Sequence, residues 1–167
     1  MAVILITGGA RSGKSKRAET RTRAFPGPPV YVATAEALDA EMDARIAEHR
    51  ARRGTDWVER EVPLDLVPTL VSTDGGGARL VDCLTLWLSN LMHAERDWER
   101  EVTGLAAALP RLKSPVVFVT NEVGLGIVPD NALARSFRDA AGIMNQTIAE
   151  AADEVEFVVA GLPMKLK

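Results

Sequence analysis

The stretch "AVILITGGARSGKS" at residues 2–15 decides the fold, because it places a glycine-rich segment directly after a short apolar run. Gly8, four further residues, Gly13, Lys14 and Ser15 match the pattern G-x-x-x-x-G-K-[ST] of loops that bind phosphate between a strand and a helix. Glycines allow the tight turn and let backbone N–H groups approach an anion, which the positive end of the following helix also attracts. The stretch therefore predicts a strand, a phosphate-binding loop and a helix.

Two side chains of this loop are expected to act on a nucleotide. Lys14 is expected to bridge the β- and γ-phosphates, and the hydroxyl of Ser15 is expected to ligate Mg²⁺. A chance match in a glycine-rich turn is the alternative. The context favours nucleotide binding, because residues 2–7 are mostly apolar and "KSKRAETRTRA" at 14–24 is compatible with a helix.

The composition is that of an ordinary globular chain. With 167 residues, 47% of them hydrophobic and 26% charged, we expect residues 1–167 to form a single nucleotide-binding catalytic domain. A net charge of −3 gives no basic footprint for nucleic acid, so the expected nucleotide is a free one. No apolar run could span a bilayer, no secretory signal is recognisable, and the single cysteine, Cys83, excludes an intrachain disulfide. These features predict a cytoplasmic protein without a membrane span.

Short apolar runs alternate with helix-compatible stretches along the chain. The runs are nearly continuous in apolar residues, which is typical of strands buried on both faces of a parallel sheet. This order predicts an α/β fold, a three-layer sandwich of the P-loop NTPase type with a mostly parallel central sheet. Strands are expected at 2–7, 29–34, 78–84, 115–120 and 155–161 with a short last one at 164–167, and helices at 13–24, 39–53, 84–109 with a break near Asp97, and 130–152.

The predicted helix at 130–152 carries an apolar stripe. Leu133, Phe137, Met144 and Ile148 fall on one side of it at helical spacing. We expect these four side chains to belong to the core rather than to a cofactor site.

Polar residues follow several of the predicted strands, at the edge where ligands of parallel α/β sheets bind. Asp82 follows the apolar run "ARLV" and could hold Mg²⁺ beside Ser15; the alternative is an aspartate that caps the following helix. Asn121 and Glu122 begin a loop with two glycines and a proline, which suits a lid over a substrate. An ordinary polar turn fits the same spacing equally well.

His49 lies in the predicted helix at 39–53, within the apolar arc of that helix. A lone histidine in such a position is more often a packing residue than a reactive one. Arg50, Arg52 and Arg53 follow it directly. They fit either a solvated helix end, where the dipole favours cations, or a clamp for a triphosphate beside a nucleophilic imidazole.

Several longer motifs give the chain a resemblance to a known family. They are "GGARSGKS" at 8–15, "LVDCLTLWLSNL" at 80–91 and "TNEVGLGIVP" at 120–129, and similar stretches run from "ILITGG" to the final "KLK". On these motifs the sequence resembles the bifunctional adenosylcobinamide kinase/adenosylcobinamide-phosphate guanylyltransferase family of cobalamin biosynthesis. The resemblance is close and covers nearly the whole chain.

This resemblance implies two reactions. Members of the family first phosphorylate the aminopropanol hydroxyl of adenosylcobinamide with a nucleoside triphosphate, GTP or ATP. They then take GMP from GTP onto a histidine, releasing pyrophosphate, and pass it to adenosylcobinamide phosphate, which gives adenosyl-GDP-cobinamide. The guanylylated histidine of the family maps onto His49, where a neutral imidazole would form a phosphoramidate. The phosphate loop is then expected to hold a γ-phosphate in one reaction and a pyrophosphate leaving group in the other.

The resemblance also implies contacts and an assembly. Lys14 and His49 are the expected catalytic residues, and Ser15 and Asp82 remain the expected metal ligands. Members of the family that the sequence resembles form trimers, so we expect a homotrimer whose active site is completed across subunits. The guanine-nucleotide contacts of the family map onto Gly8, Gly9, Ala10, Arg11, Ser12, Gly13, Lys14, Ser15, Ala33, Thr34, Ala35, Arg50, Ala51, Arg52, Arg53, Glu61 and Asp82.

Two other functions fit parts of the sequence. A plain small-molecule kinase needs the phosphate loop but leaves His49 as a packing residue. A GTPase switch is disfavoured, because the chain lacks an N-K-x-D element that reads guanine and "TNEV" at 120–123 is not one. The "DGGG" at 74–77 resembles a D-x-x-G switch only superficially, since no predicted strand leads into it.

Overall fold

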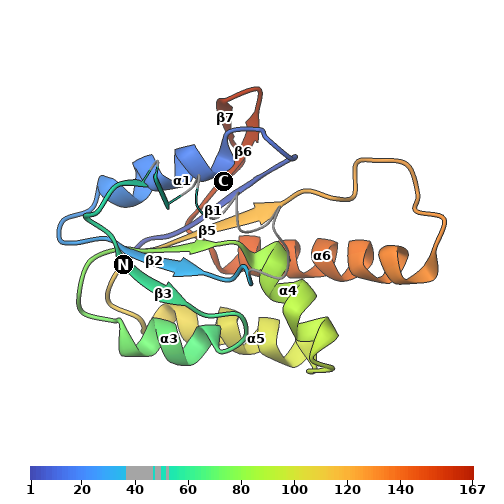
Figure 1. Cartoon of the computed structure of the whole chain (residues 1–167), viewed down its shortest axis with the longest axis horizontal. Coiled ribbons are helices and arrows are strands. Elements are labelled where there is room, and N and C mark those ends of the chain that lie inside the picture. The colour runs from blue at the N-terminus through green and yellow to red at the C-terminus, as the bar shows by residue number, and fades with distance from the viewer. Residues whose placement is uncertain (37–46, 48–49, 52) are drawn as a thin grey trace.

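A seven-stranded sheet forms the centre of the protein in the computed structural model, which describes residues 1–36, 47, 50–51 and 53–167 (Figure 1). The strands are β1 (Val3–Gly8), β2 (Val30–Ala33), β3 (Val58–Glu61), β4 (Arg79–Asp82), β5 (Val116–Asn121), β6 (Glu154–Val159) and β7 (Leu162–Lys165). The described helices are α1 (Lys14–Arg23), α3 (Leu66–Ser72), α4 (Leu84–His93), α5 (Trp98–Ala108), the 3₁₀ helix η1 (Leu109–Arg111) and α6 (Ala132–Ala151). The strand order is β3-β2-β4-β5-β1-β6-β7, and every neighbouring pair is parallel except β6 and β7.

The central strands are buried on both faces, which explains their nearly continuous apolar sequences. In β1, Val3 and Leu5 join the core on one face of the sheet, while Ile4 and Ile6 join the core on the other. This division follows from the two-residue period of a strand, and β5 repeats it. The sheet therefore separates two apolar cores.

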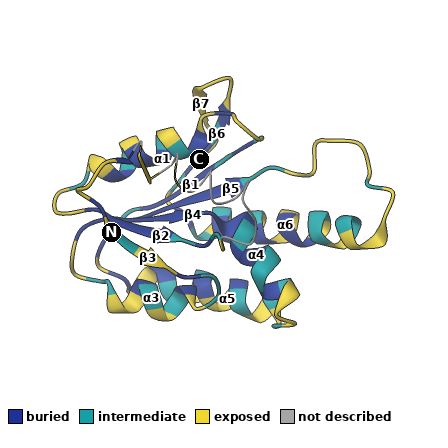
Figure 2. Cartoon of the chain, in the orientation of Figure 1, coloured by how far each residue is buried: buried dark blue, intermediate teal, exposed yellow. Residues whose placement is uncertain are grey.

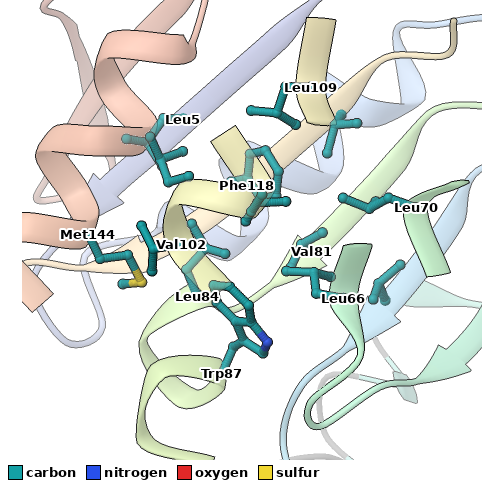
Figure 3. Packing of buried hydrophobic residues seen from close by; sticks show 14 of the residues in the cluster. Leu5, Leu66, Leu70, Val81, Leu84, Trp87, Val102, Leu109, Phe118 and Met144 are labelled. Carbon is teal, nitrogen blue, oxygen red and sulfur yellow. The ribbon is translucent and has the colours of Figure 1, made fainter. Parts of the chain in front are cut away.

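Helices cover the two faces unequally. Helix α1 lies on one face, and helices α3, α4, α5 and α6 lie on the other, around the larger core (Figures 1 and 2). That core contains Trp87 of α4, Val81 and Phe118 of the sheet and Met144 of α6 (Figure 3). The Trp87 indole donates a hydrogen bond to the Leu64 carbonyl oxygen at 2.8 Å. This arrangement confirms the predicted three-layer α/β sandwich.

The predicted elements agree closely with the described ones. The break predicted near Asp97 separates α4 from α5, and the Asp97 side chain caps α5 by accepting a hydrogen bond from the Arg100 N–H at 3.1 Å. The short last strand predicted at 164–167 is β7, which begins at Leu162. The helix predicted at 39–53 lies mostly outside the described residues. Within them, no helix is both long and apolar enough to cross a membrane.

Two short elements, β3 and α3, are not predicted from the sequence. The sequence of β3 is "VERE", with one apolar residue, because this strand is at the edge of the sheet and pairs only with β2. Helix α3 has 7 residues, which is too short for a helical repeat of apolar positions to stand out.

The predicted core stripe on α6 is wrong at its first residue. Met144 and Ile148 are fully buried and Phe137 packs against the larger core, but Leu133 is 71% exposed. The first turns of α6 extend past the edge of the sheet, so the sheet does not cover Leu133 (Figure 1).

Candidate active site

The phosphate loop, residues 8–15, runs from the end of β1 into the first turn of α1. A Cβ atom at Gly8 would lie 2.5 Å from the Val158 carbonyl oxygen, so a larger residue does not fit there. Gly13 is the N-cap of α1 and has a φ of 97°, a left-handed conformation that favours glycine. Both glycines of the motif are therefore required by the backbone, and the loop leads to the anion-binding end of a helix.

Two neighbouring segments hold the phosphate loop in place. The Gly161 N–H, in the turn between β6 and β7, donates to the Ser12 carbonyl oxygen at 2.8 Å. The Glu122 N–H, just after β5, donates to the Gly8 carbonyl oxygen at 3.1 Å. The loop is thus anchored on both sides by the sheet, which reduces the ordering that a bound phosphate would require.

Lys14 folds back over the loop to which it belongs. It is only 9% exposed, and its Nζ donates to the Gly9 carbonyl oxygen at 3.0 Å. Burial lowers the pKa of the Lys14 ammonium group, while the nearby Asp82 carboxylate acts in the opposite direction. A buried cation therefore lies within the phosphate loop, and its contact with phosphates stays a prediction.

Asp82 is the last residue of β4, and its side chain is held by a neighbouring strand. Its Oδ2 accepts a hydrogen bond from the Tyr31 hydroxyl at 3.2 Å, and burial of this phenol raises the pKa of Tyr31. The N-cap of α4 is Cys83, so the alternative in which Asp82 caps that helix is wrong.

Ser15 and Asp82 offer oxygen atoms of the kind that Mg²⁺ prefers, a hydroxyl and a carboxylate. The Asp82 charge acts to raise the pKa of Lys14, which places Asp82 close to the phosphate loop. Among the described residues, no group of three His, Cys, Asp or Glu side chains could hold a metal ion. The Ser15 hydroxyl and the Asp82 carboxylate are the donors that this chain would offer to a magnesium ion.

The register of the strands brings further predicted residues to this edge of the sheet. Ala33 at the end of β2 pairs with Glu61 of β3 on one side and with Asp82 of β4 on the other. Gly8 pairs in the same way with Asn121 of β5. The carboxyl ends of five strands thus border one edge, with the phosphate loop among them.

Thr34 locks the ends of β2 and β4 together. Its Oγ1 donates to the Cys83 carbonyl oxygen at 2.7 Å and accepts from the Cys83 N–H at 2.8 Å. The Asn90 amide of α4 donates to the carbonyl oxygens of Thr34 at 2.8 Å and of Pro63 at 3.0 Å. The side chain of Thr34 is therefore occupied by the protein, and Asn90 is a supporting residue that sequence reasoning missed.

Arg53 is buried in an ion pair, not solvated at a helix end. It is 5% exposed, its guanidinium stacks 3.4 Å from the centre of the Tyr31 ring, and its Nη2 donates to Glu59 at 2.7 Å. Arg50 is more exposed and pairs with the same carboxylate at 2.7 Å and with Glu61 at 3.7 Å. Burial acts to raise the pKa of Glu59, but hydrogen bonds from Arg50 and Arg53 outweigh this effect and lower the pKa. This group of charges lies beside the ends of β2 and β3.

The structure says less about the other predicted nucleotide contacts between β2 and β3. Ala35 is half-buried after β2, and Ala51 is exposed. His49 and Arg52 lie outside the described residues.

A polar network fixes the end of β5, and sequence reasoning missed three of its members, Thr85, Thr120 and Asn145. Thr85 of α4 accepts a hydrogen bond from the Asn121 N–H at 2.7 Å, and Thr120 donates to the Asn145 side chain of α6 at 2.7 Å. The Glu122 carboxylate accepts hydrogen bonds from the N–H groups of Gly124 at 2.7 Å and Leu125 at 3.0 Å. No spacing rule links Thr85 to Asn145, which come together only through the fold.

The family to which the chain belongs follows from sequence comparison. Residues 4–166 match the family model described as cobinamide kinase / cobinamide phosphate guanyltransferase. The chain belongs to this family. A bifunctional adenosylcobalamin biosynthesis protein, CobP, of Pseudomonas aeruginosa is 52% identical over 169 residues, which cover 98% of this chain and 96% of that protein. The CobU protein of Salmonella typhimurium, with the same description, is 44% identical over 99% of each chain.

Solved structures with a similar fold have little sequence in common with this family member. The flagellar accessory protein FlaH of Methanocaldococcus jannaschii has a TM-score of 0.60 at 15% identity, over 99% of this chain and 78% of its own. The P4 protein of bacteriophage phi6, solved with ADP, has a TM-score of 0.54 at 15% identity, over 97% of this chain and 52% of its own. These similarities support the fold.

Proposed function

We propose that this protein is a bifunctional enzyme of cobalamin biosynthesis. It phosphorylates adenosylcobinamide with a nucleoside triphosphate, ATP or GTP, and then transfers GMP from GTP to adenosylcobinamide phosphate, giving adenosyl-GDP-cobinamide and pyrophosphate. The observation that carries the proposal is the phosphate loop with buried Lys14, placed at one edge of the sheet beside Asp82, in a chain of the cobinamide kinase / cobinamide phosphate guanyltransferase family.

In the kinase reaction the chain holds and orients the phosphates. The backbone N–H groups of the phosphate loop and the Lys14 ammonium group bind the oxygens of the transferred phosphoryl group and stabilise the charge that develops on them. Ser15 and Asp82 would hold Mg²⁺, which neutralises phosphate charge when it is bound. The acceptor is the aminopropanol hydroxyl.

In the guanylyl transfer, we propose His49 as the nucleophile. A neutral imidazole nitrogen bonds to the α-phosphorus of GTP, the bond to the bridging oxygen breaks, and pyrophosphate leaves. The phosphate oxygen of adenosylcobinamide phosphate then displaces the imidazole. Arg50, Arg52 and Arg53 are proposed to bind phosphate oxygens, and for Arg50 and Arg53 those oxygens compete with Glu59.

Several further properties are proposed on family grounds. We expect a homotrimer, a cytoplasmic location, and one catalytic domain comprising residues 1–167. The curated relatives are themselves named as bifunctional, which favours two reactions over a kinase alone.

The test is to incubate the purified protein with ATP, GTP, Mg²⁺ and adenosylcobinamide and to identify the corrinoid products by mass spectrometry. The proposal predicts adenosylcobinamide phosphate when ATP alone is present and adenosyl-GDP-cobinamide when GTP is added. A kinase alone would stop at the phosphate, and absence of both products would contradict the proposal.

A further inference from the structure

A groove of about 740 Å³ borders the phosphate loop on the side that faces β6, and the proposed nucleotide contacts beside β2 and β3 do not use it. Three segments that are distant in the sequence form its walls: residues 9–12 of the phosphate loop, the start of the loop after β5, and residues 157–160 at the end of β6. Because one wall is the phosphate loop itself, a molecule in this groove lies against the bound phosphates.

The outer walls of the groove are apolar and open to solvent. Val123, Leu125, Phe157 and Val159 line it, and Leu125 is 80% and Val159 47% exposed. Figure 2 shows the exposed loop between β5 and α6 on one side and the exposed β7 hairpin on the other. Clustered apolar side chains on a surface generally mark a binding site, because leaving them in water is unfavourable.

The wall beside the phosphates carries the polar groups. Ser12 is 8% exposed, and its Oγ has no hydrogen-bond partner among the residues that the structure describes, which is uncommon for a buried hydroxyl. The Glu122 carboxylate is oriented by the N–H groups of Gly124 and Leu125, and each of its oxygens retains a lone pair. The groove therefore combines apolar walls with a hydroxyl and a carboxylate near the phosphate loop.

We propose that this groove binds the cobinamide acceptor of the kinase reaction. This inference rests on the proposed function and adds the site of the second substrate. A corrinoid is large and has hydrocarbon faces that suit the apolar walls. Its hydroxyl and amide N–H groups can donate hydrogen bonds to Glu122, and its hydroxyl is then directed toward the phosphates over residues 9–12.

Charge favours the acceptor over a nucleotide in this groove. The Glu122 carboxylate repels a polyphosphate, whereas it attracts hydrogen-bond donors of an uncharged arm. The arginines that suit a nucleotide, Arg50 and Arg53, lie beside β2 and β3 instead. Arg11 also lines the groove and is exposed, so the phosphate of the product of the first reaction meets a cation there.

The test uses two exposed apolar residues of the groove, each replaced by an acid: Leu125→Asp and Val159→Asp. The matched control is Val71→Asp, since Val71 is 58% exposed at the end of α3 and does not line the groove. We expect the KM for adenosylcobinamide to rise about tenfold or more in both groove variants, while the KM for ATP stays within about twofold. The control is expected to match the parent protein in both constants.

Direct titration of the protein with adenosylcobinamide gives a second readout that does not depend on turnover. Equal acceptor affinity in the parent and both groove variants would overturn the inference, as would a rise in the KM for ATP alone, which would place the nucleobase in the groove. An altered oligomeric state with an unchanged acceptor KM would assign the groove to a second copy of the chain. If the parent binds adenosylcobinamide but forms no product, the proposed function fails while the titration still tests the groove.

Discussion

The two sides of the phosphate loop differ in chemistry. Beside β2 and β3, buried Arg53 stacks on Tyr31 and pairs with Glu59, and Asp82 accepts a hydrogen bond from the same tyrosine. Beside β6, the loop borders an open groove with apolar walls. A buried ion pair contributes little net stability, so the charged side is better explained by the proposed nucleotide contacts than by folding. One loop can thus present a phosphate to partners of opposite character on its two sides.

The largest effect is expected from replacing Lys14, because this residue belongs to the phosphate loop that both sides border. In Lys14→Ala, corrinoid phosphorylation and guanylyl transfer are each expected to fall by about 10²- to 10³-fold, because one buried cation acts on phosphate oxygens in both reactions. Steady-state assays of the two reactions measure this. Lys16→Ala is the matched control, since Lys16 is exposed on the same helix. Loss of only one reaction would show that the two do not share the loop.

The second prediction concerns the strand that supports the apolar side. Glu156 of β6 is buried and accepts a hydrogen bond from Arg17 of α1 at 2.7 Å. This bond lowers the pKa of Glu156 despite the opposing effect of burial. Removing the carboxylate leaves arginines unpaired, so Glu156→Gln is expected to lower the free energy of unfolding by about 2 kcal/mol at pH 7.

The pH dependence of this effect has a definite sign. Because the pKa of Glu156 is lowered in the folded protein, its stabilisation is complete above the ordinary glutamate pKa of about 4.3 and is lost as pH falls through the folded value. Urea unfolding at pH 7 and at successively lower pH therefore should show the difference between the parent and Glu156→Gln shrinking. Glu150→Gln, on the exposed surface of α6, is expected to have little effect. A difference independent of pH would exclude the ion pair as its cause.

A smaller effect is expected from a substitution on the charged side, and it should affect only one of the two reactions. Arg53→Lys keeps the charge but loses the planar stack on Tyr31, so guanylyl transfer is expected to fall about tenfold, with corrinoid phosphorylation unchanged. Arg60→Lys is the control, because Arg60 is an exposed residue of the neighbouring strand β3. An equal decrease in both reactions would contradict the assignment of this side to guanylyl transfer.

Regions of the molecule also differ in how well the sequence alone predicts them. The strand, phosphate loop and helix at 2–24 follow from local pattern, since each residue type there has a requirement that the neighbouring residues reveal. The ion pair of Arg53 with Glu59 could not be predicted, because β3 has no apolar run that marks it as a strand. Leu133 was predicted in the core because helical periodicity does not indicate where the sheet ends.

The groove could not be predicted from the sequence for a related reason. Its walls come from residues near positions 10, 123 and 158, which only the order β5-β1-β6 in the sheet brings together. The sequence indicates that Glu122 begins a polar, glycine-rich loop, but this pattern fits a substrate lid and an ordinary turn equally well. The hydrogen bonds from Gly124 and Leu125 to Glu122 then account for the order at the start of this loop.

The central claim is that one chain carries out phosphoryl transfer and a guanylyl transfer through His49, and covalent labelling tests it most directly. The protein is incubated with GTP labelled at the α- or the γ-phosphate and then denatured. Label from the α-phosphate is expected on the protein, lost in acid and stable in alkali, with none from the γ-phosphate, because the leaving pyrophosphate removes it. His49→Ala should lose the label and guanylyl transfer but retain corrinoid phosphorylation, whereas His93→Ala, at the other histidine of the chain, should keep all three. Undiminished α-label on the His49→Ala protein would contradict the account.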